Sequence, residues 1–210
     1  MNVKLRRKFI ELTKRRIKPG SGSVDTHLLS RTWSYPVANL SQLITVPYII
    51  VGGVATRLYM PERMTLDLDI LIHTDRANEL YQSLKSKAIF VGDLSIGGTS
   101  WELSDKTILD ILVNNSTWVN SALKTPKTAP DGQPVIDLPY LILMKLAASR
   151  TTDISDISRM LGQASNNDLQ RVKDVIKTYD RESLEDLDSL IELGRLELGN
   201  YSRGNQNPIK

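Results

Sequence analysis

The 210-residue chain has no cysteine and only two histidines, His27 and His73. The absence of cysteine excludes disulfide bonds and thiolate metal sites. Two histidines so far apart in the sequence do not indicate a zinc cluster. The sequence also lacks an apolar run long enough to span a bilayer, and no signal-peptide pattern opens it. We therefore expect a cytoplasmic protein that has no membrane as a partner.

The charges are unevenly distributed, although the net charge is only +3. Cations crowd residues 1–18 against the single acid Glu11, whereas acids crowd residues 180–197. A basic end indicates a polyanionic partner such as RNA. The alternative is a solvated helix that lies against the acidic C-terminal segment. The sequence leaves both interpretations open.

Changes in composition and periodicity divide the chain into four expected segments. They are a basic helix with a linker, an α/β catalytic domain, a helical part and a disordered tail, at 1–23, 24–136, 137–198 and 199–210. In the first segment, Leu5, Phe9 and Leu12 share one face of a helix that Pro19 ends. The predicted fold class is α/β (α+β), with a small mixed sheet flanked by helices and followed by a C-terminal helical part.

Individual elements follow from periodicity and from helix-capping and turn residues. Strands are predicted at 48–51, 65–72, 90–91 and 108–113. Helices are predicted at 3–18, 36–44, 54–59, 75–87, 138–149, 153–162, 166–179 and 182–195. The three prolines between residues 125 and 134 predict a loop there.

Acidic residues interrupt two of the predicted strands. Asp67 and Asp69 are two residues apart and therefore project from the same face of a strand. Asp110 lies in an otherwise apolar strand, where an acid needs a partner or a metal. Mg²⁺ prefers carboxylate oxygens together with water and substrate phosphates. The alternative is that Asp67 and Asp69 only form the wet face of a half-exposed strand. Asp105 is a poorer third ligand, because it adjoins Lys106 at an expected turn.

Two glycines follow the first predicted strand and open a short helix. The bare backbone of Gly52 and Gly53 can approach a phosphate near the helix N-terminus. With the later run from Arg63 through Thr65 to Asp67 and Asp69, this pattern resembles the signature of polymerase β-type nucleotidyltransferases. Within that superfamily, the chain is most similar to AbiEii-type toxins of type IV toxin–antitoxin systems. The resemblance covers residues 47–161.

The resemblance implies a set of roles for the motif residues. Asp67, Asp69 and Asp110 are expected to be catalytic and to bind Mg²⁺ or Mn²⁺. Triphosphate binding is expected from Gly52, Gly53, Arg63, Thr65 and Lys145. The chain departs from the family where Gly53 replaces a frequent serine, and where residues 59–62 replace a frequent His-Gly.

A later helix supplies two further candidates, each with a simpler alternative. Lys145 shares a face with apolar residues, so it either reaches the site or extends its charge to solvent. The resemblance makes Asp156 the later catalytic aspartate of the toxin branch, although Asp156 also suits the first turn of a helix. Asp153 is expected to cap that helix, or to belong to the Asp-rich positions of the family. Arg63 has an alternative too, as an ion-pair partner of Asp67 or Glu62.

The resulting hypothesis is a metal-dependent nucleotidyltransferase. It would transfer a nucleoside monophosphate from a nucleoside triphosphate to a hydroxyl of RNA, such as a tRNA 3′ end, or of a protein. The resemblance adds a toxin role and a cognate antitoxin partner. The alternatives are a catalytically silent nucleotide-binding module and a small-molecule, antibiotic-type nucleotidyltransferase. The basic N-terminus favours a polyanionic acceptor over a cationic small molecule.

Overall fold

The computed structural model describes residues 1–22, 37–60, 65 and 67–199. The chain divides into two compact units, each described here by itself. The sheet unit is Asp25–Ile142, and the helical unit is Met1–Val24 with Leu143–Lys210. Among the described residues, no helix is both long and apolar enough to cross a membrane.

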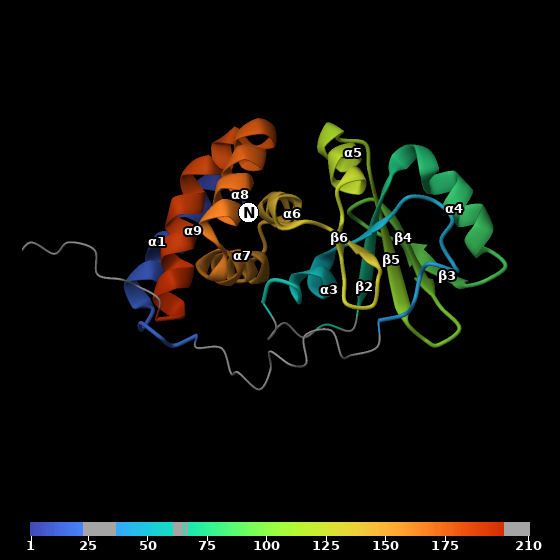
Figure 1. The fold of residues 1–210 in the computed structure, drawn as a ribbon, viewed down its shortest axis with the longest axis horizontal. Helices are drawn as coiled ribbons and strands as arrows, with labels where there is room; N and C mark the ends of the chain where they lie inside the picture. The colour runs from blue at the N-terminus through green and yellow to red at the C-terminus, as the bar shows by residue number, and fades with distance from the viewer. Residues whose placement is uncertain (23–36, 61–64, 66, 200–210) are drawn as a thin grey trace, which may run out of the picture. The chain divides into compact units, whose positions relative to one another are not determined.

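The sheet unit contains a mixed seven-stranded sheet in the order β3-β4-β5-β2-β1-β7-β6 (Figure 1). Its strands are β1 Ile49–Ile50, β2 Leu68–His73, β3 Ile89–Asp93, β4 Gly98–Glu102, β5 Ile108–Asn114, β6 Lys127–Thr128 and β7 Pro134–Val135. Its helices are α3 Gly52–Thr56, η1 Thr74–Arg76, α4 Ala77–Leu84 and α5 Thr117–Lys124. The predicted class, a mixed sheet flanked by helices, is confirmed.

The two faces of the central strands differ in chemistry, because β2 and β5 alternate in register. One face carries Leu68, Ile70 and Ile111, all buried. On the same face, Trp101 of β4 contacts the ring of Tyr81 of α4, so that helix covers it. The opposite face carries Asp69 and Asp110. The start of β2 thus places Asp69 on the face opposite Leu68 and Ile70, as the sequence predicts.

Three local expectations in the sheet unit differ from the structure. Residues 37–47 form no helix, because the Gln133 side chain accepts from Leu40 N–H at 2.9 Å and donates to Ala38 O. These long-range bonds use backbone groups that a helix would need for itself. Helix α5 was not predicted, since Val119 and Ala122 are its buried residues and give too short an apolar pattern. The predicted loop at 125–134 contains β6 and the start of β7.

The helical unit contains α1 Val3–Arg16, α7 Thr151–Gln163, α8 Asn166–Tyr179, η2 Arg181–Ser183 and α9 Leu184–Glu197. Helix α6, Leu138–Ala148, begins in the sheet unit and ends here. Helices α7 and α9 approach so closely that a Cβ added to Gly194 would lie 1.8 Å from Ser158 O. Glycine at 194 therefore permits the main packing contact of this unit.

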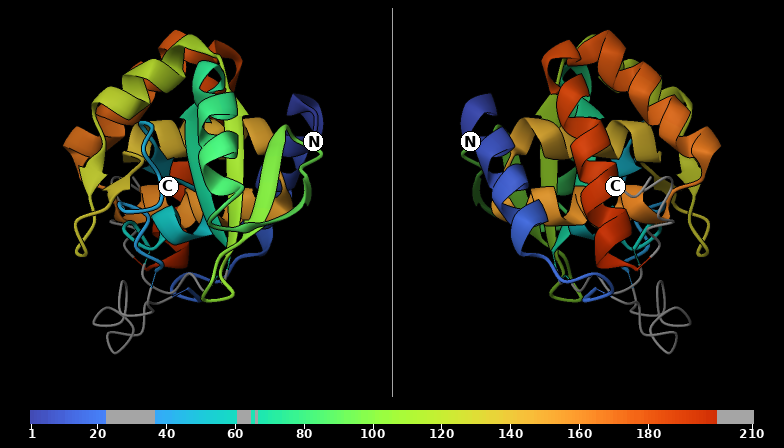
Figure 2. Two further views of the ribbon diagram at one scale, coloured as in Figure 1. Left: turned by 90° about the vertical axis from the view of Figure 1, so that its right-hand side faces the viewer. Right: turned by 90° about the vertical axis from the view of Figure 1, so that its left-hand side faces the viewer.

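Helix α1 lies alongside α9, seen as blue beside red in Figure 2. Arg6 and Ile10 form its buried face. Leu5 and Leu12, expected to be buried if the helix lay on the acidic segment, are about half exposed. The predicted stripe is wrong because Arg6, a cation, occupies the inner face and pairs with Asp186 of α9 at 2.6 Å.

The glycine-containing segment after α1 is held on the same helix. Gly20 N–H donates to Leu196 O at 2.9 Å, and Gly22 N–H donates to Glu197 O at 2.8 Å. A freely moving linker is therefore the wrong description for these residues. Ser23 and residues 200–210 of the tail predicted at 199–210 lie outside the described residues.

Candidate functional site

The site is organised by the parallel pairing of β2 with β5. Asp69 and Asp110 are register partners on these neighbouring strands. Register partners project from the same face, with strands about 4.8 Å apart. Both side chains are half-buried. Two carboxylates from separate parts of the sequence are therefore adjacent on one face of the sheet.

Gly52 brings the backbone directly against the first of these acids. Its φ of 62° lies in the left-handed region that glycine favours. A Cβ at this position would lie 1.9 Å from the Asp69 Oδ2 atom. Val51 N–H also donates to Asp69 O at 2.9 Å, which holds this turn on β2. Glycine is required here by both conformation and space.

Gly53 makes a similar close approach to the segment that precedes β2. A Cβ on Gly53 would lie 2.8 Å from the Thr65 side chain. The buried Arg57, just after α3, donates through Nη2 to Thr65 O. The Gly-Gly turn and Thr65 are thus packed together, as their shared place in the sequence signature would require. Arg63, the other basic candidate of this signature, lies outside the described residues.

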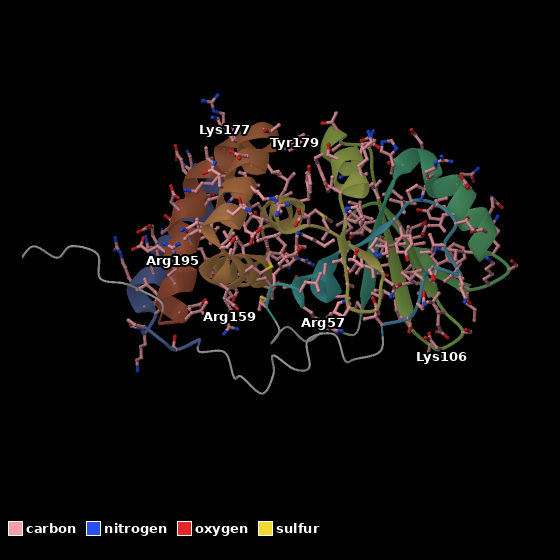
Figure 3. The ribbon with its side chains drawn as sticks, in the orientation of Figure 1. Arg57, Lys106, Arg159, Lys177, Tyr179 and Arg195 are labelled. Atoms are coloured by element: carbon pink, nitrogen blue, oxygen red, sulfur yellow. The ribbon has the colours of Figure 1, made fainter. Side chains whose placement is uncertain are left out.

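Asp67 is exposed and lines a cavity of about 530 Å³ within the sheet unit. The same cavity is lined by Arg57, Thr65, Lys106 and Thr107. Figure 3 labels Arg57 and Lys106, which extend from α3's end and from the turn between β4 and β5. The cavity therefore combines cationic and hydroxyl groups, which suit an anionic ligand, with one of the expected metal-binding acids.

Two charged groups of the β4–β5 turn also line this cavity. Asp105 accepts a hydrogen bond from Thr107 N–H at 3.0 Å, which lowers the pKa of the Asp105 carboxyl. Lys106 donates to Glu102 at 2.6 Å, and this bond with the Glu102 charge raises the pKa of Lys106. Both groups are thus held in their charged forms by local partners. Asp105 needs no metal to explain its ionisation.

The side chain of Asp110 has an oxygen that the described protein groups leave without a hydrogen bond, as expected for a residue that binds a ligand. Its Oδ1 atom is buried and has no hydrogen-bond partner among the described residues. A buried carboxylate oxygen without a donor is costly unless a cation binds it. Mg²⁺ is commonly held by one or two carboxylates with water and substrate phosphates completing its shell. The Asp69–Asp110 pair fits such an ion.

The described residues do not form a complete metal site from protein ligands alone. Within the part of the chain that the structure describes, no three His, Asp or Glu side chains are grouped closely enough to hold an ion by themselves. Asp67, the third predicted ligand, lies immediately before β2 at the cavity. The donor set therefore suits an ion shared with a substrate rather than an ion caged by the protein.

Lys145 lies in the helical unit and already has two anionic partners. Its Nζ atom is 2.7 Å from Asp156 Oδ2 and 3.3 Å from Asp153 Oδ1, and all three side chains are buried. The alternative that its charge extends to solvent is wrong, because the side chain is buried and these acids neutralise it. Its predicted role toward a triphosphate stays a prediction, as does a catalytic role for Asp156.

Asp153 caps α7, as the simpler interpretation expected. Its Oδ2 atom accepts from the Arg150 backbone N–H at 3.2 Å and from Arg150 Nε at 2.7 Å. Burial acts to raise the pKa of Asp153, but the hydrogen bonds from Arg150 and the charge of Lys145 outweigh it and lower that pKa. Lys145, Arg150, Asp153 and Asp156 are therefore connected in one ionic network.

Sequence reasoning did not single out Arg57 or Ser100. Ser100 of β4 is the register partner of Asp110 and is buried on the same face. Only the pairing of β4 with β5 reveals this neighbour, since the two residues share no local motif. Arg57 carried a usable signal, because it follows the Gly-Gly turn by one turn of helix.

No known family profile and no curated protein matches the sequence. The structure is similar to ANT(2")-Ia in complex with adenylyl-2"-tobramycin, with a TM-score of 0.41, 16% identity, and 79% of this chain and 94% of that chain covered.

Two longer proteins are also similar to the chain. The Thermotoga maritima CCA-adding enzyme complexed with tRNA has a TM-score of 0.32 and 14% identity, over 77% of this chain and 52% of that one. The Megavirus polyadenylate synthase has a TM-score of 0.35 and 10% identity, over 88% and 37%. The chain thus spans about half of the CCA-adding enzyme. Because these TM-scores are low, the function is argued from the chain's own residues.

Proposed function

We propose that the sheet unit catalyses nucleotidyl transfer, moving a nucleoside monophosphate from a nucleoside triphosphate to an acceptor hydroxyl. The observation that supports this most is the register pairing of Asp69 with Asp110, one of whose buried oxygens has no donor. Two adjacent carboxylates repel each other unless a cation lies between them. A divalent ion, bound together with a triphosphate, would supply that cation.

Each residue of the site has a proposed task. Asp69 and Asp110 would hold Mg²⁺ or Mn²⁺ together with the substrate phosphates, and Asp67 is the proposed third ligand once the substrate is bound. Such an ion, when bound, neutralises phosphate charge and lowers the barrier to displacement at phosphorus. Gly52 and Gly53 would let the triphosphate approach the backbone, and Thr65 and Arg63 are the other proposed nucleotide-binding residues of this unit.

The proposed reaction is a displacement at the α-phosphorus. The acceptor oxygen forms a bond to this phosphorus while the bond to the β-phosphate oxygen breaks, and pyrophosphate leaves. The acceptor's proton goes to a carboxylate that faces the hydroxyl, and Asp110 is the proposed recipient. General-base help of this kind contributes about 10²–10⁴-fold to a rate.

RNA is the proposed acceptor, with a tRNA 3′ end as one case and a protein hydroxyl as the other class to be tested. Lys4, Lys8, Arg15 and Arg16 remain exposed on α1 after Arg6 has paired with α9. Such cations bind phosphates without reading sequence. The AbiEii-type resemblance, the toxin role and a cognate antitoxin stay predictions.

The decisive assay incubates the full chain with each labelled nucleoside triphosphate, Mg²⁺ or Mn²⁺, and total RNA. We expect label in RNA, with pyrophosphate released in equal amount, and no label in the presence of a chelator. Asp69→Asn and Asp110→Asn should each reduce transfer by at least about 100-fold, since each removes a ligand charge.

Asp75→Asn is the matched control, because Asp75 follows the same strand but is 84% exposed. It should retain full transfer. Label in protein instead of RNA would support the reaction and contradict the proposed acceptor. Nucleotide binding without transfer to any acceptor would contradict the reaction and indicate a silent binding module.

A further inference from the structure

An edge of the sheet carries an apolar surface. β3 is the terminal strand in the sheet order, so its outer side has no strand partner among the described residues. Ile89, Phe90 and Val91 are 65%, 51% and 57% exposed, and Ile96 in the adjoining turn is 77% exposed. Soluble proteins usually protect such edges with charge, proline or a covering element. We call Ile89, Phe90, Val91 and Ile96 the β3 edge patch.

The charges around the patch have opposite signs at its two ends. The exposed Lys87 precedes β3, and the exposed Asp93 ends it. Phe90 is midway, three residues from each. An antiparallel copy of the same strand, centred on Phe90, would therefore set Lys87 of each copy opposite Asp93 of the other. A parallel arrangement would instead set like charges side by side.

Phe90 also offers an aromatic contact at the centre of that pairing. Its ring meets Trp101 edge to face, with centroids 5.4 Å apart, and Trp101 in turn contacts Tyr81. Two Phe90 rings at a twofold axis would extend this aromatic row across the interface. Directly opposed aromatic pairs stabilise strand pairing.

We propose that the β3 edge patch binds a second copy of this chain, by antiparallel pairing of β3 with its counterpart. A twofold interface requires a self-complementary surface, and the order of cation, apolar residues and anion from Lys87, in the turn before β3, to Asp93 has this property. A polyanion or an anionic membrane would meet the Asp93 charge and gain nothing from it. The proposal is independent of the proposed function.

One feature of β3 limits the strength of this association. Its pairing with β4 shifts in register between Phe90 and Gly92, which marks a β-bulge at Val91. Bulges twist an edge and shorten the ladder that a new strand can form. The apolar contact is also small compared with a standard interface. We therefore expect a reversible dimer with a dissociation constant on the order of 10–100 µM.

Sedimentation equilibrium of the full chain, over concentrations spanning that range, tests the proposal. The chain should shift from monomer to dimer. Val91→Lys should weaken the dimer at least ~10-fold, because it places two cations in the interface. Lys87→Asp and Asp93→Lys should each weaken it ~3–10-fold, whereas the double charge swap should restore the dimer to within ~3-fold.

Leu12→Lys is the matched control, since Leu12 is an exposed apolar residue of α1, outside the patch. It should leave the dissociation constant unchanged. A monomer at every concentration would overturn the proposal. A dimer that withstands Val91→Lys, or that the double charge swap fails to restore, would overturn it as well. Circular dichroism of each variant checks that the fold is retained.

Discussion

The buried acids Asp153, Asp156 and Asp186 of the helical unit pair with cations, whereas one oxygen of Asp110 in the sheet unit has no partner among the described residues. Asp186 is bound by Arg6 and Arg7, and Lys145 lies between Asp153 and Asp156. Asp110 of the sheet unit has a buried oxygen with no donor among the described residues. Acids neutralised within the fold serve stability, whereas an acid without its own donor indicates a ligand. The negative charge of these side chains would not by itself distinguish the paired acids from Asp110.

The largest effect should come from the helical unit, where Arg6 joins three helices. Its guanidinium contacts Asp186, Ser183 and Ser149 and donates to Leu146 O. Arg6→Met keeps the apolar stem but leaves Asp186 with Arg7 alone. Breaking a buried ion pair costs about 3–5 kcal/mol. Urea denaturation should show a loss of that order.

Arg16→Met provides the control for Arg6, because Arg16 is an exposed cation of the same helix. Its effect should stay within about 0.5 kcal/mol. Equal effects of the two variants would mean that α1 does not lie on α9 in solution. That result would support the other interpretation that the sequence allowed, in which α1 is a free basic arm.

A somewhat smaller loss should follow from Gly194→Ala. The added Cβ would lie 1.8 Å from Ser158 O, so α7 and α9 must separate. Overpacking of this kind costs about 1–3 kcal/mol. Thermal denaturation should show a lower midpoint, and Gly92→Ala, where a Cβ meets nothing within 4 Å, is the control. An unchanged midpoint for Gly194→Ala would contradict the close helix crossing.

The pH dependence of stability should be moderate and confined to acid conditions. The folded-state pKa of Asp153 lies below its ordinary value of 3.8. Its contribution is therefore present above the unfolded pKa and is lost as pH falls through the folded pKa. Free energies of unfolding should decline below about pH 4, and Asp153→Asn should flatten this decline.

Asp174→Asn, an exposed acid of α8, should leave the acid decline as it is in the parent chain. If Asp153→Asn and Asp174→Asn gave the same profile as the parent, the ionic network around Lys145 would not contribute to stability. Rising stability toward low pH would contradict the account of Asp153 outright.

Much of the fold could be predicted from patterns that local residues carry. Alternation at the start of the strand placed Asp69 opposite Leu68 and Ile70, and Asp110 was notable because its neighbours are apolar. Local patterns do not determine the pairing of β2 with β5, because this pairing depends on contacts between residues about 40 positions apart. The prediction of a helix at 36–44 was wrong because Gln133, distant in sequence, accepts a hydrogen bond from Leu40 N–H.

The ionic partners of the helical unit were harder to predict. Leu5, Phe9 and Leu12 gave the clearest apolar stripe of the first helix, yet Arg6 and Ile10 are the residues that pack inward. A buried arginine has no periodic signature, because its burial depends on one distant acid, Asp186. For the same reason, Lys145 gave no sequence signal of its two aspartate partners.

The smallest stability effect, and the most direct test of the comparison, belongs to Asp110→Asn. Removing one of two adjacent charges should leave the free energy of unfolding unchanged or raise it by about 1 kcal/mol, because repulsion with Asp69 is relieved.

The assignment of the metal site to the sheet unit is tested most directly by Mn²⁺ binding, followed by electron paramagnetic resonance with a non-hydrolysable triphosphate present. We predict binding by the parent chain and by Asp153→Asn, with at least ~10-fold weaker binding by Asp110→Asn. Unchanged Mn²⁺ affinity in Asp110→Asn, or its loss in Asp153→Asn alone, would contradict the assignment of the site to the sheet unit.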